Sequence, residues 1–348
     1  MFSMFKNSVK AQPVEAQESL HDESTQRIST KPSLSLLENG KIKCPGCGEE
    51  ILISDCADLS LSRCPSCGTP NFIPKLIKDY WLYEPLGGGG MGSVYHAFHK
   101  TNPKFEFAVK ILPRNRKEDK ELVNAILNEA NIGKQFGRHP HVTIVYDFGF
   151  QNNEYFAVYE YIDGIRLDQI IESSVKRPLK QIVLWGMQIL SAEQHIFDSG
   201  YLFRDLKPQN VMIDRNGNVK LIDYGLAMSV DEARVNNSDE IQGSPYYIPP
   251  ERITGSGEGQ HSEIYSLGML IFHVLAKQPY YTANDISELM GKHVIALRIN
   301  NVGGKLPSRT NPAIITIINK MIDRNPNNRY QTYKDVGKDL FELFRECA

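Results

Sequence analysis

The chain has 348 residues and a formal net charge of −2, with 41% hydrophobic and 23% charged residues. This composition is typical of a folded globular protein and excludes disordered and fibrous classes. The near-neutral balance argues against an extended nucleic-acid-binding surface, which needs clustered and uncompensated Lys and Arg. The length allows two or three domains, such as a small module beside one large domain.

No stretch reaches the ~18 consecutive apolar residues that a membrane-spanning helix requires. The longest candidate, residues 264–276, is interrupted by Ser266, Gly268 and His273. Residues 1–10 also lack the apolar core of a secretory signal. We therefore expect a cytoplasmic protein without a membrane span.

The sequence divides into three parts. Residues 1–40 are rich in Ser, Gln, Glu and Thr, a composition that cannot bury enough surface to order itself, and they predict a flexible tail. Residues 41–75 form a compact module with two near-identical Cys-Pro-x-Cys-Gly motifs. From residue 80 to about 345 the chain reads as one large domain without a second low-complexity linker.

Within the large domain, strand patterns are concentrated before helix patterns. Runs of β-branched and aromatic residues, punctuated by glycine and Asn-Asn turns, predict strands over residues 82–98, 105–112, 144–150 and 155–161. Helical spacing predicts helices over residues 121–135, 182–197, 262–276, 314–323 and 333–344. We expect an α+β fold with a strand-rich lobe at about 80–160 and a helical lobe at about 163–345. A ligand cleft is expected at the boundary of two such unlike lobes.

Four of the six cysteines form two C-x-x-C pairs: Cys44, Cys47, Cys64 and Cys67. Residues 48–63 separate the pairs, a spacing typical of two knuckles that offer four thiolates to one zinc ion. A glycine follows each pair and relieves the steric cost of the sharp turn.

A redox role for either cysteine pair is the weaker interpretation, because one shared ion explains two matched pairs better. The module resembles the zinc ribbons that attach to many unrelated proteins. That resemblance implies a structural Zn²⁺ ion with no open coordination position, and it does not identify what the module binds. Cys56 and Cys347 stand apart and have no assigned role.

A glycine-rich run begins the large domain, with Gly87, Gly89 and Gly92 in G-x-G-x-x-G register and Val94 two residues further on. This spacing alone is a weak signal, shared by flexible turns and dinucleotide-binding loops. A strand-type sequence follows it here, so we expect a hairpin whose backbone amides can approach phosphates.

Lys110 lies inside the apolar run of residues 108–112, where an unpaired ammonium group would be costly. A phosphate would be a suitable anionic partner, and Glu129 in the predicted helix is the natural carboxylate to hold the lysine. An edge-strand lysine that reaches water is the alternative that this segment alone leaves open.

Further motifs follow in order: Arg204-Asp-Leu-Lys-Pro-Gln-Asn210, Asp223-Tyr-Gly225 and Gly243-Ser-Pro-x-Tyr-x-x-Pro-Glu251. With these motifs, residues from about 80 to 344 resemble the eukaryotic-like Ser/Thr protein kinases of bacteria. The resemblance implies a bilobal protein-kinase fold. It also implies transfer of the γ-phosphate of ATP to Ser and Thr hydroxyls of protein substrates, with autophosphorylation.

The resemblance implies a role for each matching residue. Asp205 is the expected catalytic base, and Lys207 is expected to face the γ-phosphate. The remaining expected roles are phosphate binding by Lys110 paired with Glu129, and binding of Mg²⁺ or Mn²⁺ by Asn210 and Asp223.

The expected ATP-binding residues comprise the glycine loop, the strand lysine, two hinge residues and the apolar walls of an adenine pocket. They are Leu86, Gly87, Gly89, Gly92, Val94, Ala108, Lys110, Glu160, Ile162 and Met212. For the apolar members, ordinary core packing is an alternative that the sequence leaves open. Glu251 and Arg329 match a buried ion pair of the helical lobe.

Several positions depart from the family pattern: Phe203, Tyr224, Glu263, Pro249 and Gly133. We expect them to alter packing more than chemistry, because the expected catalytic side chains are all present. The alternative is a kinase-like ATP-binding scaffold, a pseudokinase that acts through the zinc ribbon. A small-molecule kinase is disfavoured by Lys207 and the Gly-Ser-Pro motif.

Arg204 precedes the expected base. The family resemblance implies that such an arginine binds a phosphate group on the activation segment through charge-assisted hydrogen bonds. Ser238 is the hypothetical phosphorylation site, with Asp239 and Glu240 as an alternative source of negative charge. The ribbon is expected to recruit a substrate, partner or regulator, which the sequence does not identify.

Overall fold

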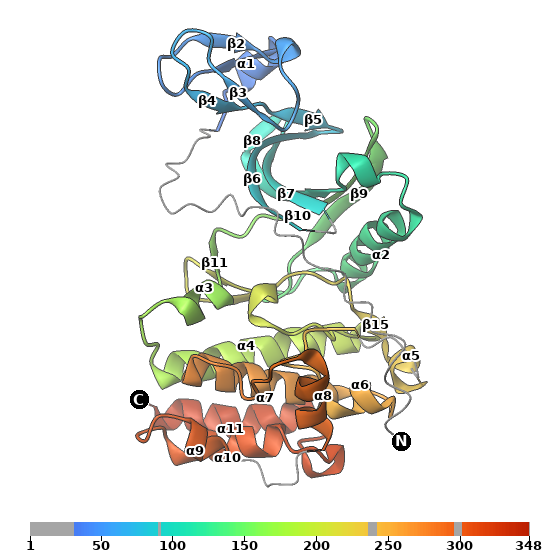
Figure 1. The fold of residues 1–348 in the computed structure, drawn as a ribbon, viewed down its shortest axis with the longest axis vertical. Helices are drawn as coiled ribbons and strands as arrows, with labels where there is room; N and C mark the ends of the chain where they lie inside the picture. Colours follow the sequence, from blue (N-terminus) through green and yellow to red (C-terminus); the bar gives the residue numbers. More distant parts are fainter. Residues whose placement is uncertain (1–30, 90–91, 236–241, 296–300, 348) are drawn as a thin grey trace. The chain divides into compact units, whose positions relative to one another are not determined.

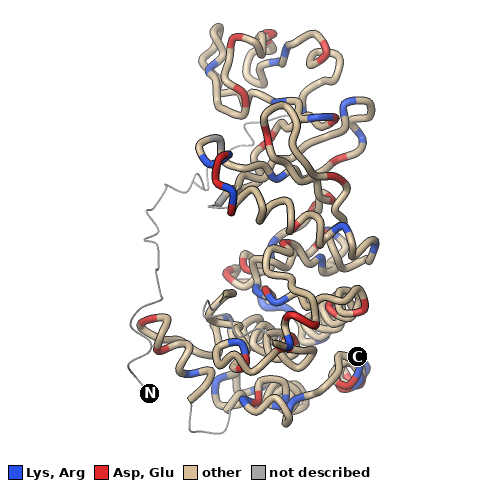
Figure 2. Tube along the Cα trace, turned by 90° about the vertical axis from the view of Figure 1, so that its right-hand side faces the viewer, with Lys and Arg blue, Asp and Glu red and all other residues tan. Residues whose placement is uncertain are grey.

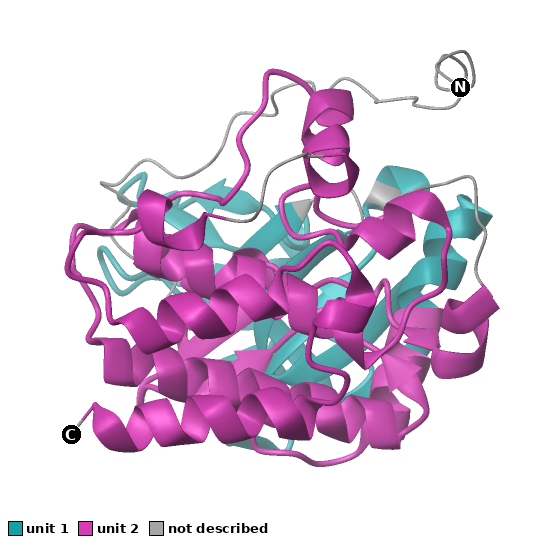
Figure 3. Ribbon diagram, turned by 90° about the horizontal axis from the view of Figure 1, so that it is seen from below, with its two compact units in different colours: residues 1–127, 145–161 teal, residues 128–144, 162–348 magenta. Residues whose placement is uncertain are grey.

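The computed structural model describes residues 31–89, 92–235, 242–295 and 301–347. The chain forms two compact units, residues 1–127 with 145–161 and residues 128–144 with 162–348 (Figure 3). Helix α2 (Lys120–Phe136) contributes residues to both units.

The first unit is built around a six-stranded antiparallel sheet in the order β5-β6-β7-β8-β10-β9 (Figure 1). Its strands are β5 (Lys75–Ile77), β6 (Tyr80–Gly89), β7 (Gly92–His99), β8 (Asn102–Ile111), β9 (Val145–Gln151) and β10 (Glu154–Glu160). The last five confirm the strand predictions. Alternate residues such as Val109, Ile111 and Phe156 are buried in one core, as expected for a sheet with period-two side chains.

The Asn-Asn turn between β9 and β10 shows how local sequence sets the pairing. Asn152 and Asn153 both have positive φ, at 52° and 59°. Two successive left-handed residues make the tight turn whose twist matches that of a hairpin, and asparagine tolerates this conformation. The turn fixes the register, with Glu154 opposite Gln151.

The cysteine-bearing module lies in the same unit and shares a hydrophobic core with the sheet. Its strands pair as β1 (Lys41–Lys43) with β2 (Glu50–Leu52), and β3 (Leu61–Arg63) with β4 (Pro70–Phe72). Ile42, Ile51 and Ile73 of the module form one buried cluster with Tyr83 of β6 and Phe98 of β7. Strand β5 then continues the module's chain directly into the sheet.

The end of the predicted flexible tail is ordered, which differs from the sequence expectation for residues 33–40. Helix α1 (Leu34–Glu38) forms there, and its Leu37 is 3% exposed within the module's core. The run Leu34-Ser-Leu-Leu37 supplies enough apolar surface to pack on a neighbour. Residues 1–30 lie outside the described residues.

The second unit is mainly helical, and its predicted long helices are confirmed. The helices are α3 (Leu167–Glu172), α4 (Leu179–Asp198), α5 (Val230–Val235), α6 (Pro250–Thr254), α7 (Gln260–Ala276), α8 (Ile286–Val294), α9 (Val302–Lys305), α10 (Pro312–Met321) and α11 (Tyr333–Glu346). Helix α7 is buried on all sides over residues 262–272, as its largely apolar sequence requires. Helices α4, α10 and α11 pack around it (Figure 1).

Two small sheets accompany these helices. The first contains β11 (Gly164–Arg166), β13 (Val211–Asp214) and β14 (Val219–Leu221). The second pairs β12 (Tyr201–Leu202) with β15 (Met228–Ser229). The loops that follow β12 and β14 therefore each begin at a strand that is paired within one of these sheets.

Helix starts in this unit follow the local sequence. The side chain of Asn311 accepts a hydrogen bond from the amide of Ala313 and precedes Pro312 at the first helical position of α10. Thr332 accepts from the amide of Asp335 at the start of α11. Such caps satisfy amides that the helix itself leaves unbonded.

Charged residues of both signs are interspersed along the trace of both units (Figure 2). Among the described helices, none combines the length and the hydropathy that crossing a bilayer would require.

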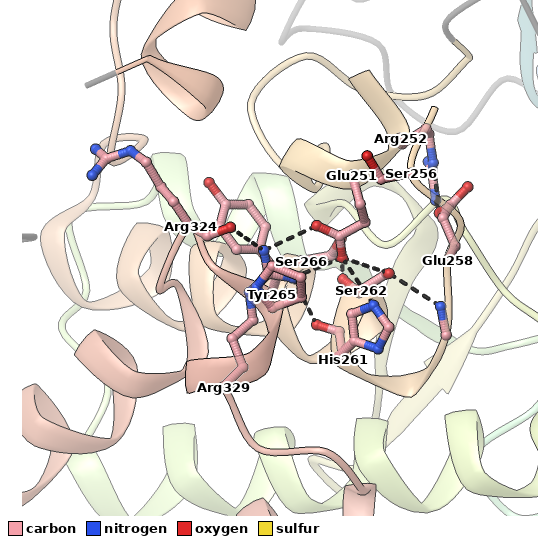
Figure 4. A network of polar contacts seen from close by, with 12 residues as sticks. Glu251, Arg252, Ser256, Glu258, His261, Ser262, Tyr265, Ser266, Arg324 and Arg329 are labelled. Atoms are coloured by element: carbon pink, nitrogen blue, oxygen red, sulfur yellow. Dashed lines mark hydrogen bonds and ion pairs between the residues drawn. The ribbon is translucent and has the colours of Figure 1, made fainter. Parts of the chain in front are cut away.

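Helices α6 and α7 are tied to the segment before α11 by a buried ion pair. Arg329 binds Glu251 through two contacts, Nη1 to Oε1 at 2.7 Å and Nη2 to Oε2 at 2.9 Å (Figure 4). Ser262 donates to Glu251 Oε1 at 2.6 Å. Burial alone would raise the pKa of Glu251, but the contacts with Arg329 and Ser262 outweigh it and lower the pKa.

The variant Arg329→Met is expected to lose about 3–5 kcal/mol of unfolding free energy, because it leaves the buried carboxylate of Glu251 unpaired. Urea unfolding measures this loss. Arg345→Met is the matched control, because the Arg345 side chain is 65% exposed and its loss should change stability by less than about 0.5 kcal/mol. Equal unfolding midpoints for the two variants would contradict the prediction.

Candidate active site

The loop after β12 brings together two predicted catalytic residues, Asp205 and Lys207, and the predicted metal-binding residue Asn210. Asp205 Oδ2 accepts from Lys207 Nζ at 2.7 Å and from Asn210 Nδ2 at 2.8 Å. The same Asn210 nitrogen donates to the backbone oxygen of Asp205 at 2.9 Å. Because Pro208–Asn210 form a 3-10 turn, the side chain of Asn210 folds back onto Asp205.

The other carboxylate oxygen of Asp205 is an open acceptor. Oδ1 is buried and has no hydrogen-bond partner among the described residues. Burial raises the pKa of Asp205, the nearby Asp223 adds to this rise, and Lys207 and Asn210 oppose it. A buried acceptor without a donor is costly, so this oxygen suits a ligand that brings a hydroxyl group.

The segment after β14 lies beside this loop. The amide of Ile222 donates to the backbone oxygen of Asn210 at 3.0 Å. Asp223 has a left-handed backbone with φ of 70°, and its Oδ1 accepts from the amide of Gly225 at 3.1 Å. A side-chain carbon at Gly225 would lie 3.2 Å from Asp223 Oδ1 and 3.9 Å from Glu129 Oε2. Asn210, Asp223 and the buried Glu129 therefore lie around one region of the second unit.

The chemistry of this donor set fits a hard cation. Asn210 uses its amide nitrogen on Asp205, so the amide oxygen is the group that can bind a metal ion. Carboxylate and amide oxygens are ligands that Mg²⁺ and Mn²⁺ accept.

The first unit carries the predicted glycine loop as a hairpin of β6 and β7. Gly87 lies opposite Val94 and Gly89 opposite Gly92, and the tip at residues 90–91 lies outside the described residues. Gly92 has φ of 143°, and a side-chain carbon there would come within 2.5 Å of the backbone oxygen of Ile111. Only glycine fits this close approach to β8.

Lys110 lies in β8 directly opposite Val94 of β7 and Ala157 of β10. Directly paired residues share a face of the sheet, and so do residues two apart in one strand. Lys110, Val94 and Ala108 therefore share one face, while Val109 and Ile111 are buried on the other. Leu86, in the glycine loop, is 41% exposed.

The predicted hinge residue Glu160 ends strand β10. Next to it, the ring of Tyr161 stacks on His96 with centroids 3.8 Å apart. His96 Nδ1 lies 2.8 Å from the hydroxyl of Tyr83, which belongs to the core shared with the cysteine module. Ile162 belongs to the second unit, as does Met212 in β13.

The two aromatic departures from the family pattern pack together. Tyr224 is fully buried, and its ring meets Phe136 at 5.1 Å and Phe203 at 6.3 Å between centroids. Its hydroxyl donates to the backbone oxygen of Thr143 at 2.6 Å. A buried hydroxyl is tolerated when it is hydrogen-bonded, so tyrosine is compensated at this position. No sequence pattern indicates that Thr143 accepts this hydrogen bond.

The four cysteines of the module converge as predicted. Their sulfur atoms all lie within 4.8 Å of one another. The Sγ atoms of Cys44 and Cys67 are 3.6 Å apart, as are those of Cys47 and Cys64. Zinc–sulfur bonds of about 2.3 Å in a tetrahedron place sulfurs about 3.8 Å apart, so the cluster fits a zinc ion.

Comparison with known proteins identifies the large domain. Residues 80–341 match the family model described as "Protein kinase domain". The chain belongs to the protein kinase family. Its strand-rich first unit and helical second unit are those of the predicted α+β protein-kinase fold.

Named relatives share this domain. The chain is 29% identical over 276 residues to "Serine/threonine-protein kinase PrkC" of Bacillus subtilis (strain 168), covering 78% of this chain and 41% of the relative. It is 28% identical to "Serine/threonine-protein kinase PknB" of Mycobacterium leprae (strain TN), covering 78% and 44%. The "cAMP-dependent protein kinase catalytic subunit" of Schizosaccharomyces pombe is 26% identical, with 76% and 49% covered. The chain thus spans less than half the length of these relatives.

A pair of buried glutamates lies close to the loop that carries Asp205. Glu263 of α7 accepts from the amide of Arg204 at 3.0 Å, while its second oxygen has no partner among the described residues. Glu193 of α4 is 1% exposed, and neither of its oxygens has a partner there. Burial raises the pKa of Glu263 to about 7 and, together with Glu263, raises that of Glu193. Sequence reasoning missed Glu193, because one acid on a helix usually indicates a solvated face.

Glu193→Gln is expected to stabilise the kinase at neutral and alkaline pH. Above the ordinary value of 4.5 the unfolded chain releases protons that the folded protein keeps, so wild-type stability falls as pH rises from 4.5 through about 7. Removing one of the two acids should flatten this decline and raise the melting temperature at pH 8. Melting curves from pH 5 to 8 test this, with the exposed Glu342→Gln as control. Parallel profiles for Glu193→Gln and wild type would contradict it.

Proposed function

We propose that this protein is a Ser/Thr protein kinase that transfers the γ-phosphate of ATP to Ser and Thr hydroxyls of proteins, itself included. One observation carries the proposal, namely the Asp205 carboxylate held by Lys207 and Asn210 with Oδ1 left open. Membership of the protein kinase family and the names of its relatives support it.

The chain's own groups divide the work of phosphoryl transfer. Asp205 Oδ1 would accept the hydrogen bond of the substrate hydroxyl and take its proton as the bond to phosphorus forms. Lys207 would neutralise charge on the transferred group, and Lys110 would bind the remaining phosphates. Asn210 and Asp223 would hold Mg²⁺ or Mn²⁺, which would supply charge neutralisation when bound with ATP.

The residues expected from the family resemblance would bind ATP. Gly87, Gly89 and Gly92 would bring backbone amides to the phosphates, and the backbone of Glu160 and Ile162 would bind adenine. The apolar walls would come from Leu86, Val94, Ala108 and Met212. Their positions in the strands β6, β7, β8 and β13 are compatible with these roles.

Replacement of Asp205 by Asn is expected to lower phosphate transfer to a generic basic protein by about 10²–10⁴-fold, because the proton acceptor is lost. Incorporation from ATP and Mg²⁺ would be located by mass spectrometry, with the exposed Asp198→Asn as control. ATP affinity should change little. A wild-type protein that binds ATP but transfers nothing would favour the scaffold alternative, whereas undiminished transfer by the variant would show that Asp205 is not the base.

We also propose that Cys44, Cys47, Cys64 and Cys67 bind one structural Zn²⁺ ion. The convergence of the four sulfurs supports this, and so does the buried core around Cys44 and Cys64. Because that core includes Tyr83 and Phe98 of the sheet, the ion would stabilise the kinase strands as well as the ribbon. The zinc ribbon would bind a protein partner or substrate. The cytoplasmic location of the protein stays a prediction.

One zinc ion per chain is expected by atomic emission, and Cys64→Ser should remove it. The variant should also melt at a lower temperature, because the shared core loses its metal support. Cys347→Ser is the control and should keep both the metal and the wild-type melting temperature. Full zinc content in Cys64→Ser would contradict the assignment.

A further inference from the structure

Arg204, the residue before the proposed base, has a conformation that needs external support. Its φ is +65°, in the left-handed region, which costs free energy for a residue with a Cβ atom. Such a conformation persists only where surrounding contacts over-determine it. The contacts that hold Arg204 therefore also set the position of Asp205.

The backbone of Arg204 is held from both sides. Its amide donates to Glu263 Oε2 at 3.0 Å, and its carbonyl oxygen accepts from Arg252 Nη1 at 2.7 Å. The side chain is 4% exposed and also contacts Met228 Sδ at 3.2 Å through Nη1.

One carboxylate binds both arginines. Glu258 Oε1 accepts from Arg204 Nε at 3.0 Å and Nη2 at 2.8 Å. Glu258 Oε2 accepts from Arg252 Nε at 2.8 Å and Nη2 at 2.6 Å (Figure 4). The Glu258 side chain is 3% exposed. Four charge-assisted bonds thus use both oxygens of a buried group, which makes the geometry specific.

The turn after α6 delivers Glu258 to this position. Gly257 has φ of 82°, and a side-chain carbon there would approach the backbone oxygen of Arg234 to 2.5 Å. The amide of Glu258 donates to the backbone oxygen of Ala233 at 2.9 Å. The turn therefore packs directly on helix α5, which follows β15 in the activation segment.

Both arginines of this cluster are paired with one anion within the second unit. Arg204 and Arg252 each bind the carboxylate of Glu258, while Glu263 accepts from the backbone amide of Arg204. An activating phosphate would bind where a buried arginine lacks an anion. Here Glu258 already occupies the guanidinium groups of both arginines.

We propose that Glu258 is a positioning residue that locks Arg204 and thereby sets Asp205 for catalysis without a phosphate on the activation segment. This rests on the proposed kinase activity. The hypothetical site Ser238 lies outside the described residues, and by this proposal its phosphorylation is not needed for activity.

The test compares Glu258→Gln, Glu258→Asp and wild type in the full chain. Loss of the charge in Glu258→Gln should lower kcat by roughly tenfold or more, with the KM for ATP nearly unchanged. Glu258→Asp keeps the charge and should recover part of kcat. Asp231→Asn on α5, whose side chain is 96% exposed, is the matched control and should behave as wild type.

Treatment of wild type with a phosphatase, checked by mass spectrometry, is expected to leave kcat unchanged. A kcat that collapses on dephosphorylation would overturn the proposal, and so would a Glu258→Gln variant with wild-type kcat.

Hydrogen exchange of the peptide containing residues 201–206 gives a readout that does not depend on activity. Its amides should exchange faster in Glu258→Gln than in wild type and Asp231→Asn. If the wild type transfers no phosphate, the proposed kinase function is wrong. Hydrogen exchange of this peptide then tests by itself whether Glu258 positions Arg204. Unchanged exchange in Glu258→Gln would then overturn it.

Discussion

The second unit depends on one constraint, which is that a buried charge must meet a partner inside the protein. Glu251 with Arg329 and Glu258 with two arginines satisfy it by paired contacts. At Glu193, burial and the neighbouring Glu263 raise the pKa, which favours the neutral form of this carboxyl group. The loop that carries Asp205 is attached to these groups through the amide and carbonyl of Arg204, so the position of the proposed base depends on how the charges beside this loop are neutralised.

In the first unit, the constraint is the small size of the cysteine module. A module of this size has little apolar surface with which to form its own core, and here its apolar residues pack against those of the kinase sheet. Tyr83 contacts both regions, through the shared core and through its contact with His96, on which the ring of Tyr161 stacks. The module is thus part of the structure that carries the glycine loop.

Much of this architecture could be predicted from residue order alone. The paired cysteines, the glycine loop and the run from Arg204 to Asn210 are local patterns whose spacing encodes geometry directly. Glu258 could not be found in this way, because its partner Arg204 lies 54 residues away and a lone glutamate in a turn usually faces water. The helix α1 was missed for a similar reason, since three leucines in a polar segment form a buried helix only when a neighbouring core receives them.

The shared core has a consequence for where the catalytic domain begins. The family match starts at Tyr80, yet a fragment cut there would lose strand β5 and uncover Tyr83 and Phe98. The edge of β6 would then present unpaired backbone groups next to bare aromatic rings, which is the combination that promotes sheet-to-sheet association between molecules. In this kinase the segment before Tyr80 therefore also covers the edge of β6 and the rings of Tyr83 and Phe98.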